Sequence, residues 1–179
     1  MATLPISLND GTNIPWLAFG SGTALYGQDA STQVENAIKA GFRHIDTAQM
    51  YSNEDSVGAG IAAAGVPRSE LYITTKLHKL PAGQTVRDTL VSSLRKLRTD
   101  HVDLFLIHMP NDHEDLKQTW KEMEAVQQEG LAKTIGVSNF QPNHLDVVLE
   151  VAKIIPAVNQ VCQVISLLLV LDLTFFLID

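Results

Sequence analysis

Gly41-Phe42-Arg43-His44-Ile45-Asp46-Thr47-Ala48 is the segment that says most about how this chain is built. Residues 43–46 are predicted to form a short strand that runs out into a loop. Gly41 suits the C-terminal cap of a preceding helix, because glycine readily adopts a positive φ. Thr32 and Glu35 match a capping box at the start of that helix. The segment therefore joins a helix to a strand, and a second, small-residue helix is predicted at 55–64.

Strands and helices alternate along most of the chain. The first part is the exception, because two apolar segments flank an Asn9-Asp10-Gly11 turn and predict a hairpin. Its strands are expected at 5–8 and 14–19. Further strands are predicted at 43–46, 71–75, 102–107, 133–137 and 157–161, and further helices at 85–97, 116–128 and 144–152. The strand starts recur at roughly the thirty-residue length of a βα unit.

Repeated βα units require a parallel sheet with right-handed crossovers. An open doubly wound sheet and a closed eight-stranded barrel both fit this periodicity. A doubly wound nucleotide-binding fold usually carries G-x-G-x-x-G after its first strand, but here Gly20-Ser21-Gly22 is followed by Thr23-Ala24-Leu25. Polar residues instead stand at the ends of several strands, as is typical of barrels. We therefore predict an α/β fold of the (β/α)8 TIM-barrel class with an N-terminal hairpin.

Composition narrows the class of protein. The chain has 179 residues, a net charge of −7 and a single cysteine, Cys162. Lys and Arg are scattered, which disfavours nucleic acid or an anionic membrane surface as the main partner. No internal disulfide is possible, and the N-terminus lacks the basic and apolar regions of a signal peptide. These features predict one main domain and a cytoplasmic location.

Four polar residues stand at or just beyond successive strand ends: Asp46, Tyr51, Lys76 and His108. A free phenol has a pKa of about 10, which is too high for efficient proton transfer at neutral pH. A nearby lysine ammonium favours the phenolate and lowers that pKa, and an aspartate supplies the counter-charge that a buried lysine needs. A histidine donates a hydrogen bond to the same carbonyl oxygen. The set predicts a general acid for carbonyl reduction, with the hydride coming from a cofactor.

Two long motifs resemble the signatures of the aldo-keto reductases. The first is the 41–48 segment followed by Tyr51 and Asn53-Glu54, and the second is 130–140. The resemblance covers about residues 5–161. It implies a barrel closed at one end by the hairpin, which reduces aldehydes or ketones with NADPH (NADP). By the same resemblance the catalytic tetrad falls on Asp46, Tyr51, Lys76 and His108.

The resemblance also implies residues that bind the cofactor and the substrate. Ser138 and Asn139 are expected to hold the nicotinamide carboxamide, with Gln160 beside them. Further cofactor contacts are expected from Gly22, Thr23 and Asp46, and substrate contacts from Tyr26, Tyr51, His108 and Met109. No metal is expected, because the six histidines show no paired ligand spacing.

Each of these residues also has a plainer interpretation. Asp46 alone is compatible with a helix cap, Tyr51 with a rim aromatic, Lys76 with a solvated lysine and His108 with a hydrogen-bonded histidine. Their joint placement favours the catalytic interpretation. His44 is expected to be a hydrogen-bonded core histidine, and Trp120 is expected to pack in the core because it falls on an apolar helical stripe.

Residues 1–161 are predicted to form the part that resembles the aldo-keto reductases, and residues 162–179 a divergent hydrophobic tail. A complete barrel needs about 250 residues, so the chain is expected to be a C-terminally truncated member with about six of eight βα units. Three interpretations of the apolar tail are open: non-native sequence, a makeshift seventh strand and a membrane anchor. We favour the first. No stable membrane insertion is expected. Exposed sheet edges predict self-association. The alternative function is a non-catalytic protein that cannot hold cofactor and acts by association.

Overall fold

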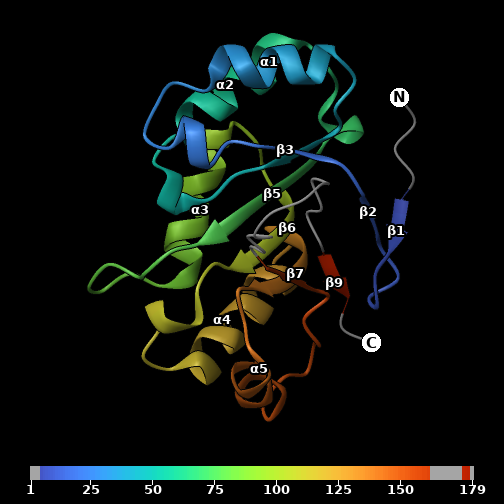
Figure 1. Ribbon diagram of the computed structural model, residues 1–179. Helices are drawn as coiled ribbons and strands as arrows, with labels where there is room; N and C mark the ends of the chain where they lie inside the picture. Colours follow the sequence, from blue (N-terminus) through green and yellow to red (C-terminus); the bar gives the residue numbers. More distant parts are fainter. Residues whose placement is uncertain (1–4, 162–174, 178–179) are drawn as a thin grey trace, which may run out of the picture.

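The computed structural model describes residues 5–161 and 175–177. The strands of these residues form two sheets (Figure 1). Strands β1 (Pro5–Ser7) and β2 (Asn13–Pro15) form the antiparallel hairpin, which lies apart from the helices. The main sheet has the order β3-β4-β5-β6-β7-β8-β9. Its first six strands are parallel and curl into a half-barrel: β3 (Ala18–Gly20), β4 (His44–Asp46), β5 (Tyr72–Leu77), β6 (Val102–Ile107), β7 (Ala132–Ser138) and β8 (Val158–Gln160). The predicted α/β barrel class is confirmed.

Five α-helices connect the parallel strands, each in the place expected of a βα repeat. Their bounds are α1 (Ser31–Lys39), α2 (Glu54–Ala64), α3 (Val86–Leu97), α4 (Leu116–Gln128) and α5 (Pro142–Leu149). Short 3-10 turns follow three of the strands at η1 (Thr23–Leu25), η2 (Gln49–Tyr51) and η4 (Pro110–Asp112), and η3 (Arg68–Glu70) lies between α2 and β5.

Two local predictions were wrong. The expected strand 14–19 is divided, because β2 pairs in the hairpin while β3 pairs with β4. Pro15 ends β2, which agrees with its inability to donate a ladder hydrogen bond. The capping box at Thr32 is also absent. Helix α1 begins at Ser31 with Ala30 as its N-cap, two residues before the predicted cap, and the Oδ1 atom of Asp29 accepts a hydrogen bond from the Ser31 N–H at 2.8 Å.

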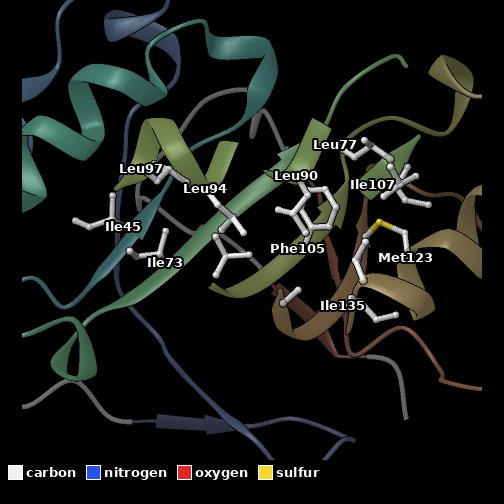
Figure 2. Packing of buried hydrophobic residues seen from close by; sticks show 14 of the residues in the cluster. Ile45, Ile73, Leu77, Leu90, Leu94, Leu97, Phe105, Ile107, Met123 and Ile135 are labelled. Carbon is white, nitrogen blue, oxygen red and sulfur yellow. The ribbon is translucent and has the colours of Figure 1, made fainter. Parts of the chain in front are cut away.

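The main core lies between the half-barrel and its helices (Figure 2). Apolar side chains from the strands meet the stripe that α3 presents at helical spacing. Trp120 of α4 is fully buried, as predicted, and its indole N–H donates to the backbone oxygen of Ile154 at 3.1 Å. The side chains labelled in Figure 2 are Ile45, Ile73, Leu77, Phe105, Ile107 and Ile135 from strands, Leu90, Leu94 and Leu97 from α3, and Met123 from α4.

Strand alternation places polar side chains on the opposite face from this core. His44, Asp46, Thr74 and Lys76 alternate along β4 and β5 with the buried residues Ile45, Ile73, Thr75 and Leu77. His44 is the hydrogen-bonded core histidine that was predicted. Its Nδ1 lies 3.1 Å from the backbone oxygen of Pro15 and its Nε2 lies 2.8 Å from the hydroxyl of Thr74, and burial lowers its pKa. The inner face of the sheet is therefore polar near the strand ends.

Strand β9 (Phe175–Leu177) pairs antiparallel with β8, with Gln160 opposite Phe175. A strand of the tail that pairs with the last parallel strand is what the seventh-strand interpretation predicted. Residues 162–174, 178 and 179, on which the other interpretations of the tail depend, lie outside the described residues. Self-association through sheet edges stays a prediction. Within the residues described, no helix is long and apolar enough to span a membrane.

Helices α2 and α3 approach so closely that Gly58 leaves no room for a side chain. A Cβ atom there would lie 2.1 Å from the backbone oxygen of Lys96. Helix propensity alone favours Gly58→Ala by about 0.5–1 kcal/mol. We expect the steric conflict to prevail, so that Gly58→Ala lowers the free energy of unfolding by about 1–3 kcal/mol in urea denaturation.

The matched control is Ala62→Gly at an exposed position of the same helix. It should lower the free energy of unfolding by about 1 kcal/mol through propensity alone. A stabilising Gly58→Ala would contradict the close helix contact.

Candidate active site

The four predicted catalytic residues converge at the carboxyl ends of the parallel strands. Asp46 is the last residue of β4, Lys76 lies near the end of β5, and His108 directly follows β6. Tyr51 comes from η2, in the loop after β4. Because neighbouring parallel strands end at the same edge, residues far apart in sequence meet in one place.

Asp46 and Lys76 form a buried ion pair. The Nζ atom of Lys76 donates to the Oδ1 atom of Asp46 at 2.5 Å and to the backbone oxygen of Thr47 at 3.2 Å. The Lys76 and Asp46 side chains are only 3% and 10% exposed. The other carboxylate oxygen, Oδ2, accepts from the Nε2 atom of Gln160 at 3.2 Å. Each charge thus has the partner that its removal from water requires.

Tyr51 lies between the lysine and the histidine. The ammonium of Lys76 is 5.4 Å from the centroid of the phenol ring. The His108 ring meets the Tyr51 ring edge to face, with centroids 5.5 Å apart and planes at 84°. The phenol is therefore within reach of one cation and one imidazole, as the predicted proton-transfer set requires.

His108 is held in its neutral form. Burial is the main cause that lowers its pKa to about 4, and the charge of Lys76 adds to the effect. Its Nδ1 atom is buried and has no hydrogen-bond partner among the described residues. A neutral imidazole keeps one N–H to donate and one nitrogen to accept, so it can orient a carbonyl oxygen without carrying charge.

These side chains line a cleft of about 280 Å³ together with the expected cofactor residues. Ser138 donates its hydroxyl to the backbone oxygen of Gln160 at 2.7 Å, and Asn139 donates to the backbone oxygen of His108 at 3.0 Å. Asn139 has a positive φ of 60°, so its backbone is locally strained. The residues lining the cleft are Gly20, Gly22, Thr23, Asp46, Tyr51, Lys76, His108, Ser138, Asn139, Gln160 and Val161.

The donor set of the cleft fits a nicotinamide. The Oε1 atom of Gln160 is buried and has no hydrogen-bond partner in the part of the chain described. A carboxamide offers an N–H₂ group to such an acceptor and an oxygen to neighbouring hydroxyl or amide donors. Ser138 and Asn139 stand next to Gln160, and their side-chain donors bond to the backbone oxygens of Gln160 and His108. The cleft thus presents polar groups that match the hydrogen-bonding pattern of a carboxamide.

Gly22 is required by the approach of the phenol. A Cβ at this position would lie 2.9 Å from the Cζ atom of Tyr51 and 3.2 Å from its hydroxyl oxygen. The next residue, Thr23, has φ of 46°, which is unusual for a β-branched side chain. The loop after β3 therefore packs directly on the Tyr51 ring.

The two remaining substrate candidates lie outside the cleft lining. Tyr26 is 52% exposed, and its ring centroid is 6.2 Å from that of Tyr51. Met109 is 36% exposed, and its sulfur lies 3.2 Å from the Nδ2 atom of Asn139. Both are therefore rim residues. Sequence reasoning missed Gly20 and Val161 as lining residues, although each directly adjoins a predicted segment.

No group of three or more His, Cys, Asp or Glu side chains is arranged to hold a metal ion within residues 5–161 and 175–177. The site consists of a buried ion pair, a phenol and a neutral imidazole at the strand ends of a half-barrel. A phenol beside a buried lysine–aspartate pair and a neutral imidazole is a set of groups that can transfer a proton to a bound substrate.

Comparison with known proteins agrees. The model of the aldo/keto reductase family matches residues 16–165, and the chain belongs to this family. It is 42% identical over 157 residues to glyoxal reductase of Bacillus subtilis, covering 87% of this chain and 56% of that protein. It is 41% identical over 163 residues to methylglyoxal reductase DkgA of Escherichia coli, with the same coverage of 87% and 56%. The chain thus spans little more than half the length of these relatives.

Solved structures show the same fold. An aldo/keto reductase from Brucella melitensis matches with a TM-score of 0.81 at 38% identity, covering 89% of this chain and 63% of that one. A Bombyx mori aldo-keto reductase in complex with NADP matches with a TM-score of 0.80 at 38% identity, covering 90% and 58%. The parallel half-barrel is therefore a shared substructure of larger barrels.

The lowered pKa of His108 gives a test by pH. Between pH 6.5 and about 4 the unfolded chain binds a proton at His108 that the folded chain does not. The folded state therefore loses stability as pH falls through this window. We expect the His108 ring to titrate near pH 4 by NMR. We also expect His108→Gln to lose less unfolding free energy than the wild type between pH 7 and pH 4.5.

Assignment of the ring signal rests on its disappearance in His108→Gln. A titration midpoint at or above 6.5 would show that the imidazole is not held neutral by its surroundings.

Proposed function

We propose that this chain is an NADPH-dependent aldo-keto reductase that reduces aldehydes or ketones to alcohols, with Tyr51 as the general acid. The observation that carries the proposal is the convergence of Asp46, Tyr51, Lys76 and His108 on one cleft with Ser138, Asn139 and Gln160. Membership of the family and the similarity to named reductases support it.

The proposed roles follow from the contacts. Tyr51 donates a proton to the carbonyl oxygen as that oxygen gains negative charge. Lys76 favours the resulting phenolate, and Asp46 holds the ammonium in place through the 2.5 Å contact. His108 stays neutral and donates a hydrogen bond that orients the carbonyl. When bound, NADPH supplies the hydride to the carbonyl carbon.

The same cleft residues are proposed to hold the cofactor. Ser138, Asn139 and Gln160 bind the carboxamide of the nicotinamide, and Gly22 and Thr23 contact the cofactor from the opposite loop. The neighbouring structure from Bombyx mori is a complex with NADP, which supports the choice of cofactor. The Gln160 side chain also donates to Asp46, so cofactor binding and the ion pair share one residue.

Small aldehydes are the proposed substrates. Two relatives are named for the reduction of glyoxal and methylglyoxal, and the cleft of about 280 Å³ suits compounds of that size. Tyr26 and Met109 contact the part of the substrate that leaves the cleft. We propose that the activity resides in the cytoplasm, in keeping with a chain that has one cysteine and no internal disulfide.

The first experiment is a fluorescence titration of the purified chain with NADPH, followed by assays with methylglyoxal and glyoxal. We expect saturable binding and NADPH oxidation. Tyr51→Phe should lower kcat by about 10²-fold or more, because it removes the acid while leaving the ring in place. NADPH binding by this variant should stay within a few-fold of the wild type.

Tyr72→Phe is the matched control, since it removes the same hydroxyl from a tyrosine near the start of β5, away from the cleft. The Tyr72 hydroxyl has no hydrogen-bond partner among the described residues. Its loss should leave the rate unchanged. A Tyr51→Phe variant with most of its activity would refute the acid. A folded chain that binds no NADPH would favour the non-catalytic alternative, action by association.

A further inference from the structure

Asn53 occupies the N-cap position of α2 but makes no side-chain bond to its own helix. The residue is only 4% exposed, and its amide reaches into the loop after β3 instead. Its Nδ2 atom donates to the backbone oxygen of Ser21 and to that of Leu25, both at 2.8 Å. Its Oδ1 atom lies 3.4 Å from the donating hydroxyl of Ser21. One buried amide thus bridges two points of a neighbouring loop.

The two carbonyl groups that Asn53 binds flank the strained part of that loop. Between them lie Gly22, which has no room for a Cβ against the phenol, and Thr23 with its φ of 46°. A β-branched residue keeps such a conformation only where its surroundings enforce it. The amide of Asn53 supplies this enforcement from both sides, because it binds the Ser21 carbonyl before Thr23 and the Leu25 carbonyl after it.

The same loop contacts Tyr51 through Gly22, Tyr26 and Gly27. Gly22 packs on the phenol ring, and the Gly27 N–H donates to the backbone oxygen of Tyr51 at 2.8 Å. Tyr51 itself belongs to a short 3-10 turn and not to a strand, and its ring meets both the Lys76 ammonium of β5 and this loop. The position of its ring therefore depends on the loop that lies against it.

We propose that Asn53 is a positioning residue for the general acid: its amide holds residues 21–27 in the strained shape that seats the Tyr51 phenol. The proposal rests on the function proposed above, in which Tyr51 donates the proton. Loss of the amide lets Thr23 relax, and Gly22 then moves away from the ring. The Tyr51 ring then adopts other orientations, and its hydroxyl points away from the carbonyl oxygen in most enzyme–substrate complexes.

A purely structural role for Asn53 as a helix cap predicts something different. Helix α2 has two acidic residues, Glu54 and Asp55, in its first turn, which favour its N-terminus without a side-chain cap. Serine is a good N-cap residue but is too short to bridge Ser21 and Leu25. Asn53→Ser therefore keeps the helix start while removing the link to the loop.

The experiment measures two properties of the purified chain with Asn53→Ser. Hydrogen exchange of the 21–27 backbone in the absence of cofactor should become about tenfold faster or more. At saturating NADPH, kcat with methylglyoxal should fall about 10–100-fold, as expected when a catalytic group is displaced by about 1 Å. The primary isotope effect with deuterated NADPH should rise, because the chemical step becomes slower.

Thr85→Ala is the matched control for general destabilisation. Thr85 caps α3 through a capping box, away from the cleft, and its loss costs about 1 kcal/mol. This variant should leave both kcat and the exchange of 21–27 within about twofold of the wild type. Equal effects of Asn53→Ser and Thr85→Ala would overturn the proposal.

A double-mutant cycle tests the route through Gly22. Gly22→Ala forces the phenol to move, since the new Cβ would lie 2.9 Å from it. If Asn53 acts through this contact, the double variant is about as slow as the slower single variant. Fully multiplicative losses would overturn the proposal.

The hydrogen-exchange result separates this proposal from the proposed function. A wild-type chain without reductase activity would refute the function, while faster exchange in Asn53→Ser would still show that the amide holds the loop. Unchanged exchange in Asn53→Ser would overturn the positioning role even in an active enzyme.

Discussion

The buried ion pair between Lys76 and Asp46 is the contact on which the rest of the site depends. Both charges are almost fully removed from water, so neither is tolerated without the other. The pairing of β4 with β5 places Asp46 opposite Thr74, and Lys76 lies two residues further toward the strand end. The alternation of the strand keeps both side chains on the inner face. Sheet register thus sets the charge geometry before any loop is placed.

The loops complete the site by close contacts and not by further charge. Tyr51 is carried by a 3-10 turn whose first residue, Gln49, accepts from the His78 N–H at 2.9 Å and donates to the hydroxyl of Ser93 at 3.1 Å. On its other side the phenol meets Gly22, where any side chain would collide with it. Tyr51 is therefore held between two loops that are anchored to different helices and strands.

The sequence predicted most of the architecture because the hydrophobic periodicity is strong. Helix α4 has the predicted bounds, and α3 begins within one residue of its predicted start and ends at the predicted residue. The misses are local. The strand predicted across Pro15 is divided between two sheets, because an apolar run of this kind does not specify which partner each half pairs with. The Thr32 cap failed because Asp29 supplied an alternative acceptor to the helix start.

By itself, the sequence determined the class of fold, the strand ends that carry chemistry and the family, since these follow from short-range pattern and from motifs. Asp46, Tyr51, Lys76 and His108 were predicted from their places at or near strand ends and from the resemblance of two motifs to the family. Only the tertiary structure decided that Gln160 bonds to Asp46 and that Asn53 crosses to the loop after β3. These contacts join residues 114 and 32 positions apart. No local pattern encodes them, because strand register and loop packing bring such residues together only when the whole sheet has formed.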